Sequence, residues 1–138
     1  MGRRPLSHIL LDTHTWAWAL TATQRLSPKA LAAIERAETV SISAITLYEV
    51  GQKARLGKWP VMAELVPQLV SIAARQEARL VSVTPDITVL AAGFDWSHRD
   101  PFDRLIAATA ILLGGLLVSA DETFDELAEI PDWPGRLW

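Results

Sequence analysis

The sequence contains no cysteine among its 138 residues. This absence excludes disulfide bonds and thiolate metal sites, so oxygen ligands and the three histidines remain for binding a metal ion. Long apolar runs are also missing. The longest, Leu105–Ala120, is shorter than the ~20 residues of a membrane span and is interrupted by Gly114-Gly115. The sequence therefore predicts no transmembrane segment.

A secretory signal is not recognisable either. The two arginines of the opening "MGRRPL" are followed by an apolar stretch that Asp12 and His14 interrupt. A cytoplasmic location is the resulting expectation. Excess positive charge is likewise lacking, since the formal net charge is −3. A generally basic nucleic-acid-binding surface is thus excluded, and any contact with a nucleic acid has to come from a local patch.

The composition that remains is that of a globular protein. Half of the residues are hydrophobic and 21% are charged, without repeats or low-complexity tracts. A chain of this length suits one domain over residues 1–138, with about two-thirds of the unfolded surface buried.

Short apolar runs alternate with helical segments along the chain. The runs of strand length are 8–12, 39–43, 79–83 and 116–120. The segments with helix signals are 28–38, 44–56, a stretch from Pro60 onward, 86–94 and 101–113. Pro67 leaves open whether the stretch after Pro60 is one kinked helix or two. The alternation predicts an α/β fold whose parallel or mostly parallel sheet is covered by helices.

Acidic residues stand where such a sheet places its ligands. Asp12 and Asp121 directly follow two of the expected strands, and Glu49 lies in the helix entered from the strand that ends near Ser43. Ligands of parallel sheets bind outside the carboxyl ends of the strands, near the switch in strand order. We therefore expect these three carboxylates to converge.

The segment "HRDPFDRLIAATA" adds two more acids at the start of an almost wholly apolar helix. Asp100 suits the N-cap and Pro101 the first helical position, which leaves Asp103 in the first turn. An apolar helix is normally buried, so its N-terminus should point toward the same site. On this interpretation Asp100 caps the helix, whereas Asp103 joins the other three carboxylates.

Four converging carboxylates require a cation. Two unit charges 4 Å apart repel by about 4 kcal/mol even at an effective dielectric constant of 20. Mg²⁺ and Mn²⁺ take oxygen ligands and bridge to phosphate, which matches metal-dependent phosphodiester hydrolysis. Each acid taken singly has a simpler explanation as a helix cap, a dipole partner or a solvated side chain. The joint pattern is more specific than its parts.

Four stretches of the chain, "LLDTHTWAWAL", "SISAITLYEVGQKARLGK", "HRDPFDRLIAATA" and "LLVSADETFDEL", resemble the ordered motifs of PIN-domain ribonucleases, in particular the VapC-type toxins of bacterial toxin–antitoxin pairs. The resemblance implies a PIN-like three-layer α/β/α sandwich and a Mg²⁺- or Mn²⁺-dependent endoribonuclease. It implies that the catalytic and metal-binding residues are Asp12, Glu49, Asp103 and Asp121. It also implies a homodimer that a cognate antitoxin inhibits by covering the acidic pocket.

Residues that bind the RNA substrate are less clearly marked. The candidates are Ser119, His98, Arg99, Lys53, Arg55 and Lys58. Arg104 also flanks Asp103, although solvated helix charge explains the basic residues almost as well. Trp59 could stack on a base, whereas Trp16 and Trp18 suit the core or a dimer interface.

Two other functions are compatible with the sequence. One is a catalytically inactive PIN-like module that binds RNA or protein, and the other is a metal-dependent phosphatase. A phosphatase of the haloacid-dehalogenase type needs a second aspartate two positions after the first, where this chain has His14.

Overall fold

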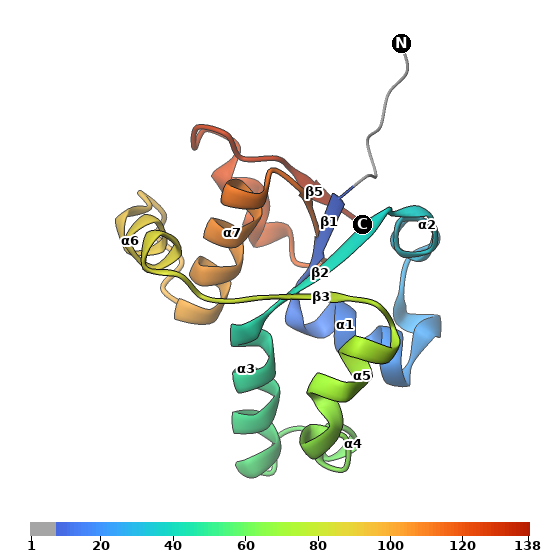
Figure 1. Ribbon diagram of the computed structural model, residues 1–138. Coiled ribbons are helices and arrows are strands. Elements are labelled where there is room, and N and C mark those ends of the chain that lie inside the picture. The colour runs from blue at the N-terminus through green and yellow to red at the C-terminus, as the bar shows by residue number, and fades with distance from the viewer. Residues whose placement is uncertain (1–7) are drawn as a thin grey trace.

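The computed structural model describes residues 8–138 and confirms the α/β fold (Figure 1). One sheet contains β1 (His8–Leu11), β2 (Thr39–Ser43), β3 (Arg79–Val81), β4 (Leu116–Val118) and β5 (Arg136–Leu137). The strand order is β3-β2-β1-β4-β5, and every neighbouring pair is parallel. The sheet is therefore parallel throughout the part of the chain that the structure describes.

Helices connect the strands. The α-helices are α1 (Thr13–Thr21), α2 (Pro28–Arg36), α3 (Ala44–Arg55), α4 (Pro60–Ala63), α5 (Leu69–Arg75), α6 (Pro85–Gly93) and α7 (Pro101–Leu113). Within residues 8–138, the 3₁₀ turns are η1 (Thr23–Arg25), η2 (Val66–Gln68) and η3 (Glu122–Leu127). The alternative left open at Pro67 is resolved as two helices, α4 and α5, with Pro67 in the η2 turn between them.

The sheet separates two hydrophobic clusters. Successive side chains of β1 point to opposite faces, so Ile9 and Leu11 belong to one cluster and Leu10 to the other. Buried residues of α1, α2 and α5 pack in the first cluster, and those of α6, α7 and η3 in the second. Figure 1 shows α6 and α7 on one side of the sheet and α1, α2 and α5 on the other. The result is the expected three-layer sandwich.

The strand order reverses between β1 and β4. The chain runs outward from β1 through β2 to β3 and then returns to place β4 on the other side of β1. This is the switch point at which a crevice forms beyond the carboxyl ends of the strands. The backbone N–H of Asp12 donates to the carbonyl of Val118 at 3.2 Å, which aligns the two strand ends.

The glycine pair 114-115 ends α7 as the sequence predicts. Gly114 adopts a left-handed conformation with φ 70° at the helix C-cap. A Cβ atom at Gly115 would lie 2.8 Å from the backbone oxygen of His8, so β4 enters the sheet beside β1 only because this position has no side chain.

Two expected strands are shorter in the structure. The strand expected over 79–83 ends at Val81, and the one expected over 116–120 ends at Val118. β5 was not predicted, because two residues after a proline-rich turn carry no periodicity. Across residues 8–138, every helix is too short or too polar to cross a lipid bilayer. The inference about a secretory signal rests partly on residues 1–7, which lie outside the described residues.

Candidate active site

A cavity of about 500 Å³ lies at the switch point between β1 and β4. All four acids singled out from the sequence line it, namely Asp12, Glu49, Asp103 and Asp121. They come from the end of β1, from α3, from the first turn of α7 and from the segment after β4. Residues distant in the sequence thus meet at one edge of the sheet.

Asp12 is a buried residue of the cavity and is held by two hydrogen bonds. It is the N-cap of α1, and its Oδ1 accepts the backbone N–H of Thr15 at 2.9 Å. Its Oδ2 accepts the hydroxyl of Ser119 at 2.6 Å. Burial nevertheless raises the pKa of Asp12, because only 7% of the residue is exposed and these hydrogen bonds offset the desolvation incompletely. A cation at this carboxylate would stabilise its charged form.

Glu49 is buried, lines the same cavity as Asp12 and has two hydrogen-bond partners. The hydroxyl of Thr13 donates to Oε1 at 2.6 Å, and the ammonium group of Lys53 donates to Oε2 at 2.8 Å. Lys53 stands one helical turn after Glu49 on α3, which is the spacing at which side chains meet. Its charge is therefore engaged with Glu49 in this structure, where the sequence suggested a contact with RNA phosphate.

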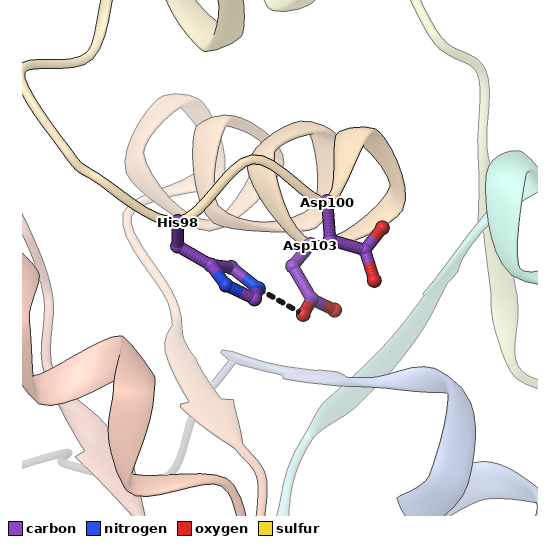
Figure 2. A group of neighbouring side chains, drawn as sticks. All are labelled: His98, Asp100 and Asp103. Atoms are coloured by element: carbon purple, nitrogen blue, oxygen red, sulfur yellow. Dashed lines mark hydrogen bonds and ion pairs between the residues drawn. The ribbon is translucent and has the colours of Figure 1, made fainter.

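Asp103 and His98 form a close pair, shown in Figure 2. His98 Nε2 lies 2.7 Å from Asp103 Oδ2. Burial raises the pKa of Asp103 to about 6, although the hydrogen bond from His98 lowers it. His98 comes from the loop that precedes α7, so the loop and the helix N-terminus contribute jointly to this side of the cavity.

Asp100 does more than the sequence suggested. It is the N-cap of α7, and its Oδ1 accepts the backbone N–H of Phe102 at 2.9 Å, as expected. Its assignment to capping alone was wrong, because it also lines the cavity. Oxygen and nitrogen atoms of His98, Asp100 and Asp103 lie within 4.8 Å of one another, so these three residues could hold a metal ion. An N-cap side chain stands at the mouth of its helix, and this signal could have pointed to Asp100 as a cavity residue.

Asp121 lies at the open side of the site and is exposed. Its Oδ1 accepts the backbone N–H of Thr123 at 2.9 Å at the start of η3. Partial burial alone would raise its pKa, but this hydrogen bond and the nearby positive charges of His98 and Arg136 bring the pKa of Asp121 below its usual value. Asp121 therefore keeps its charge more readily than Asp12 or Asp103.

Ser119 connects the two acids that follow the central strands. Besides donating to Asp12, its hydroxyl accepts the backbone N–H of Asp121 at 3.0 Å. Ser119 is fully buried. Its hydroxyl is used inside the protein, so the structure gives Ser119 a role in orienting Asp12, and the predicted contact with substrate stays a prediction.

The remaining basic candidates lie outside the cavity. Arg55, Lys58 and Arg99 are exposed and do not line it. Arg104 is engaged elsewhere, because its guanidinium group donates to the carbonyls of Ala91, Phe94, Trp96 and His98 at 2.8–3.0 Å. The interpretation of Arg104 as a phosphate ligand is corrected, since this side chain holds the loop that carries His98.

The family model of the PIN domain matches residues 9–130. The chain belongs to the PIN-domain family. This PIN domain is 34% identical over 117 residues to "Ribonuclease VapC22" of Mycobacterium tuberculosis (strain ATCC 25618 / H37Rv), a match that covers 84% of the chain and 88% of that relative.

Solved structures show the same fold. The PIN domain matches VapBC2 from Rickettsia felis bound to a DNA fragment from its promoter with a TM-score of 0.65 at 18% identity, covering 95% of this chain and 98% of that one. It matches a toxin–antitoxin complex from Klebsiella pneumoniae with a TM-score of 0.64 at 20% identity, covering 94% and 96%.

The donor set of this PIN domain suits a hard divalent cation. The cavity offers carboxylate oxygens and an imidazole, with no thiolate in the chain. Among residues 8–138, Lys53 is the one lysine or arginine that lines the cavity, and it already neutralises Glu49. Burial raises the pKa of both Asp12 and Asp103, so the charged forms of these acids are under-compensated by the protein alone. The cavity therefore fits a cation together with an anionic ligand.

Proposed function

We propose that this chain is a Mg²⁺- or Mn²⁺-dependent endoribonuclease that acts as a toxin and is inhibited by a cognate antitoxin. The observation that carries the proposal is the convergence of four carboxylates on one cavity, to which the described part of the chain contributes a single fixed positive charge, that of Lys53. Membership of the PIN-domain family and the similarity to a VapC ribonuclease support the reaction class.

Asp12, Asp103 and Asp121 are the proposed metal ligands, with Glu49 as the fourth acid of the site. A bound Mg²⁺ or Mn²⁺ would lower the pKa of an attacking water and stabilise charge on the phosphodiester. The chain's own groups orient the ligands: Ser119 and Thr15 fix the Asp12 carboxylate, and His98 fixes that of Asp103. Thr13 and Lys53 hold Glu49 toward the same cavity. Such hydrogen bonds behind metal ligands set their orientation.

The proposed partner is a small antitoxin with a basic tail, acting on a homodimer of this chain in the cytoplasm. Structural neighbours of this PIN domain are toxin–antitoxin complexes, and an acidic cavity pairs well with arginine, whose guanidinium group binds carboxylates in bidentate geometry. A cationic side chain in the cavity would compete with the metal ion for the same oxygens.

Cleavage of a total RNA pool by purified protein in Mg²⁺ tests the activity. Asp12→Asn and Asp103→Asn should each reduce cleavage at least 100-fold, because an amide keeps the shape of the carboxylate but loses the ligand charge. The matched control is Asp95→Asn, which changes an exposed acid outside the cavity and should leave the rate unchanged. Full cleavage by either cavity variant would overturn the proposal.

The same preparations separate the two alternatives. A metal-dependent phosphatase would release phosphate from a small phosphomonoester and leave the RNA intact. An inactive binding module would retain RNA without shortening it. A small basic protein from the same operon should copurify with the wild type and suppress cleavage. A failure of this last test alone would count against the antitoxin and leave the nuclease in place.

A further inference from the structure

A row of four aromatic rings includes two that line the acidic cavity, His14 and Trp18. It consists of Trp59, His14, Trp18 and Trp138, and we call it the aromatic row. The ring centroids of Trp59 and His14 are 4.8 Å apart, those of His14 and Trp18 are 5.7 Å apart, and those of Trp18 and Trp138 are 5.9 Å apart. The rings come from α1, from the loop before α4 and from the segment after β5.

Packing explains three of these rings and leaves the fourth unexplained. Trp18, Trp59 and Trp138 are half-buried and pack against the hydrophobic cluster below α1. His14 is exposed, and it lines the cavity together with Trp18. The tryptophans therefore hold the His14 ring in place while leaving it accessible from the cavity.

Positive charges accompany the row. The Lys53 ammonium nitrogen lies 5.6 Å from the centroid of the Trp59 ring, and Arg25 Cζ lies 4.8 Å from that of Trp18. Arg25 is exposed and is free of any salt bridge or side-chain hydrogen bond found among the described residues. Lys53 is paired with Glu49, so Arg25 is the cation that can meet a phosphate beside the row. Aromatic rings next to such a cation are typical of proteins that bind single-stranded nucleic acids, because bases stack on the rings while phosphates pair with the cation.

The position of His14 relates the row to the acids. His14 stands two residues after Asp12 in the first turn of α1, so its ring borders the floor of the acidic site. A phosphate held at the acids would place the adjoining nucleotide beside this ring. The base of that nucleotide must be unpaired, because a base within a duplex presents only its edge to a protein.

We propose that His14, positioned by Trp59 and Trp18, is a stacking subsite for an unpaired base of single-stranded RNA next to the phosphate bound at the acidic cavity. The inference rests on the proposed ribonuclease function and extends it to a feature of the substrate. Stacking accepts any base, since every base has a π face, so this subsite selects for an unpaired nucleotide and not for its identity.

The test measures binding separately from cleavage. The probes are a fluorescein-labelled 12-nucleotide oligoadenylate and the same ribose-phosphate backbone without bases. Fluorescence anisotropy gives their affinities in buffer containing Ca²⁺, with the length of the probe checked on a gel afterwards. The variants are His14→Ala, which removes the ring, and His14→Phe, which keeps a ring but lacks the imidazole. Because His14 is exposed, both variants should fold, and circular dichroism verifies this.

The expected loss for His14→Ala on oligoadenylate is about 5- to 100-fold, the range for one base stacked on an aromatic ring. His14→Phe should bind within about threefold of the wild type, since a phenyl ring stacks as well. The baseless probe should bind wild type and His14→Ala equally. Lys29→Ala, which removes an exposed cation on α2 away from the cavity, should bind both probes as the wild type does.

Three results would overturn the subsite. They are equal binding of oligoadenylate by wild type and His14→Ala, an equal loss on both probes, and a wild type that does not prefer oligoadenylate to the baseless backbone. Cleavage of the RNA pool in Mg²⁺ is scored separately. If the wild type cleaves RNA and His14→Ala binds oligoadenylate normally, only the stacking subsite is refuted. If the wild type cleaves no RNA, the proposed function is refuted.

Kinetics give a second readout. A ring that binds the base equally in the ground state and the transition state contributes uniform binding. His14→Ala should therefore raise KM for a single-stranded substrate and leave kcat within about threefold. A loss confined to kcat would contradict a stacking role.

Discussion

Ser119 and Asp12 share a hydrogen bond of 2.6 Å across 107 positions of the chain, and the same Ser119 hydroxyl accepts the backbone N–H of Asp121 at 3.0 Å. One buried hydroxyl thus links two acids that follow neighbouring strands. The carboxylate of Asp12 depends on this donor because it is nearly inaccessible to water.

Removal of this hydroxyl should weaken both the fold and the site. In Ser119→Ala, Asp12 Oδ2 loses its donor and the Asp121 N–H loses its acceptor, and a buried group left unpaired costs about 1 to 3 kcal/mol. Urea unfolding should show a loss of that size, and RNA cleavage should fall about 10- to 100-fold as Asp12 loses its orientation. Ser41→Ala is a useful comparison, because it removes a buried hydroxyl that bonds to His8 away from the cavity. Equal cleavage by Ser119→Ala and the wild type would contradict the orienting role.

The stability of the metal-free protein should depend on pH through Asp103. Burial raises the pKa of this group to about 6 in the folded state, above its value of about 3.9 in the unfolded chain. The folded state therefore binds the proton more tightly, and this contribution to stability is complete below about pH 4 and lost as the pH rises through about 6. It amounts to roughly 1 to 3 kcal/mol.

Urea unfolding in EDTA between pH 4 and 7 measures this contribution. The free energy of unfolding of wild type relative to Asp103→Asn should fall over that range, because the amide cannot titrate. Burial also raises the pKa of Asp12, so the stability contributed by Asp12 depends on pH as well. Both proteins contain Asp12, so its contribution cancels in their difference. A constant difference between the two proteins across the range would show that Asp103 keeps an ordinary pKa.

Mg²⁺ should stabilise the wild type more than variants of its ligands. Neutralising Asp103 removes its repulsion from the other carboxylates, which is of order 1 kcal/mol for each pair after solvent screening. The favourable interaction of Asp103 with the helix dipole is also lost, but this costs only about 0.3 to 1 kcal/mol. Asp103→Asn should therefore melt above the wild type without metal and show a smaller increase in Tm when Mg²⁺ is added.

Asp100→Asn extends this test to the residue that the sequence assigned to capping alone. Asparagine still caps α7, but the carboxylate that neighbours Asp103 and His98 is lost. The Mg²⁺-induced shift in Tm should therefore lie between those of the wild type and Asp103→Asn, with Asp95→Asn as the unaffected control. A shift identical to that of the wild type would mean that Asp100 is a cap and nothing more. Thermal melts at low ionic strength measure all four proteins.

Arg104→Lys should destabilise the protein despite keeping the charge. Four backbone carbonyls accept hydrogen bonds from the guanidinium group, and an ammonium group cannot reach them all. We expect a loss of about 2 to 4 kcal/mol, from several unpaired acceptors. The loop before α7 carries His98, so hydrogen exchange should increase there first. Arg99→Lys changes an exposed residue of the same loop and should alter the free energy of unfolding by less than about 0.5 kcal/mol.

Sequence reasoning located the site because its signals are local. An acid directly after an apolar run marks the carboxyl end of a strand, and this rule placed Asp12 and Asp121 at the correct edge of the sheet. The proline after Asp100 likewise identified the start of α7. These features follow from backbone geometry within a few residues.

What the sequence left undetermined depends on partners distant along the chain. No local signal shows that Arg104 bonds to carbonyls 6 to 13 positions before it, or that Ser119 lies behind Asp12. β5 was missed because Arg136 and Leu137 become a strand only by pairing with β4. The place of Asp100 in the cavity was missed because its role as the N-cap of α7 already explained an acid at this position.

Because β1 lies at the centre of the sheet, the four acids come together only when the strands on both sides of β1 are in place. One neighbour, β2, emerges early in synthesis, whereas the other, β4, is made only after α7 is complete. Contacts between segments so far apart form late, since the intervening loop has to be closed first. A chain made only as far as the end of α7 therefore has Asp12, Glu49 and Asp103 but lacks Asp121. Asp121 joins the other acids only once β4 docks beside β1.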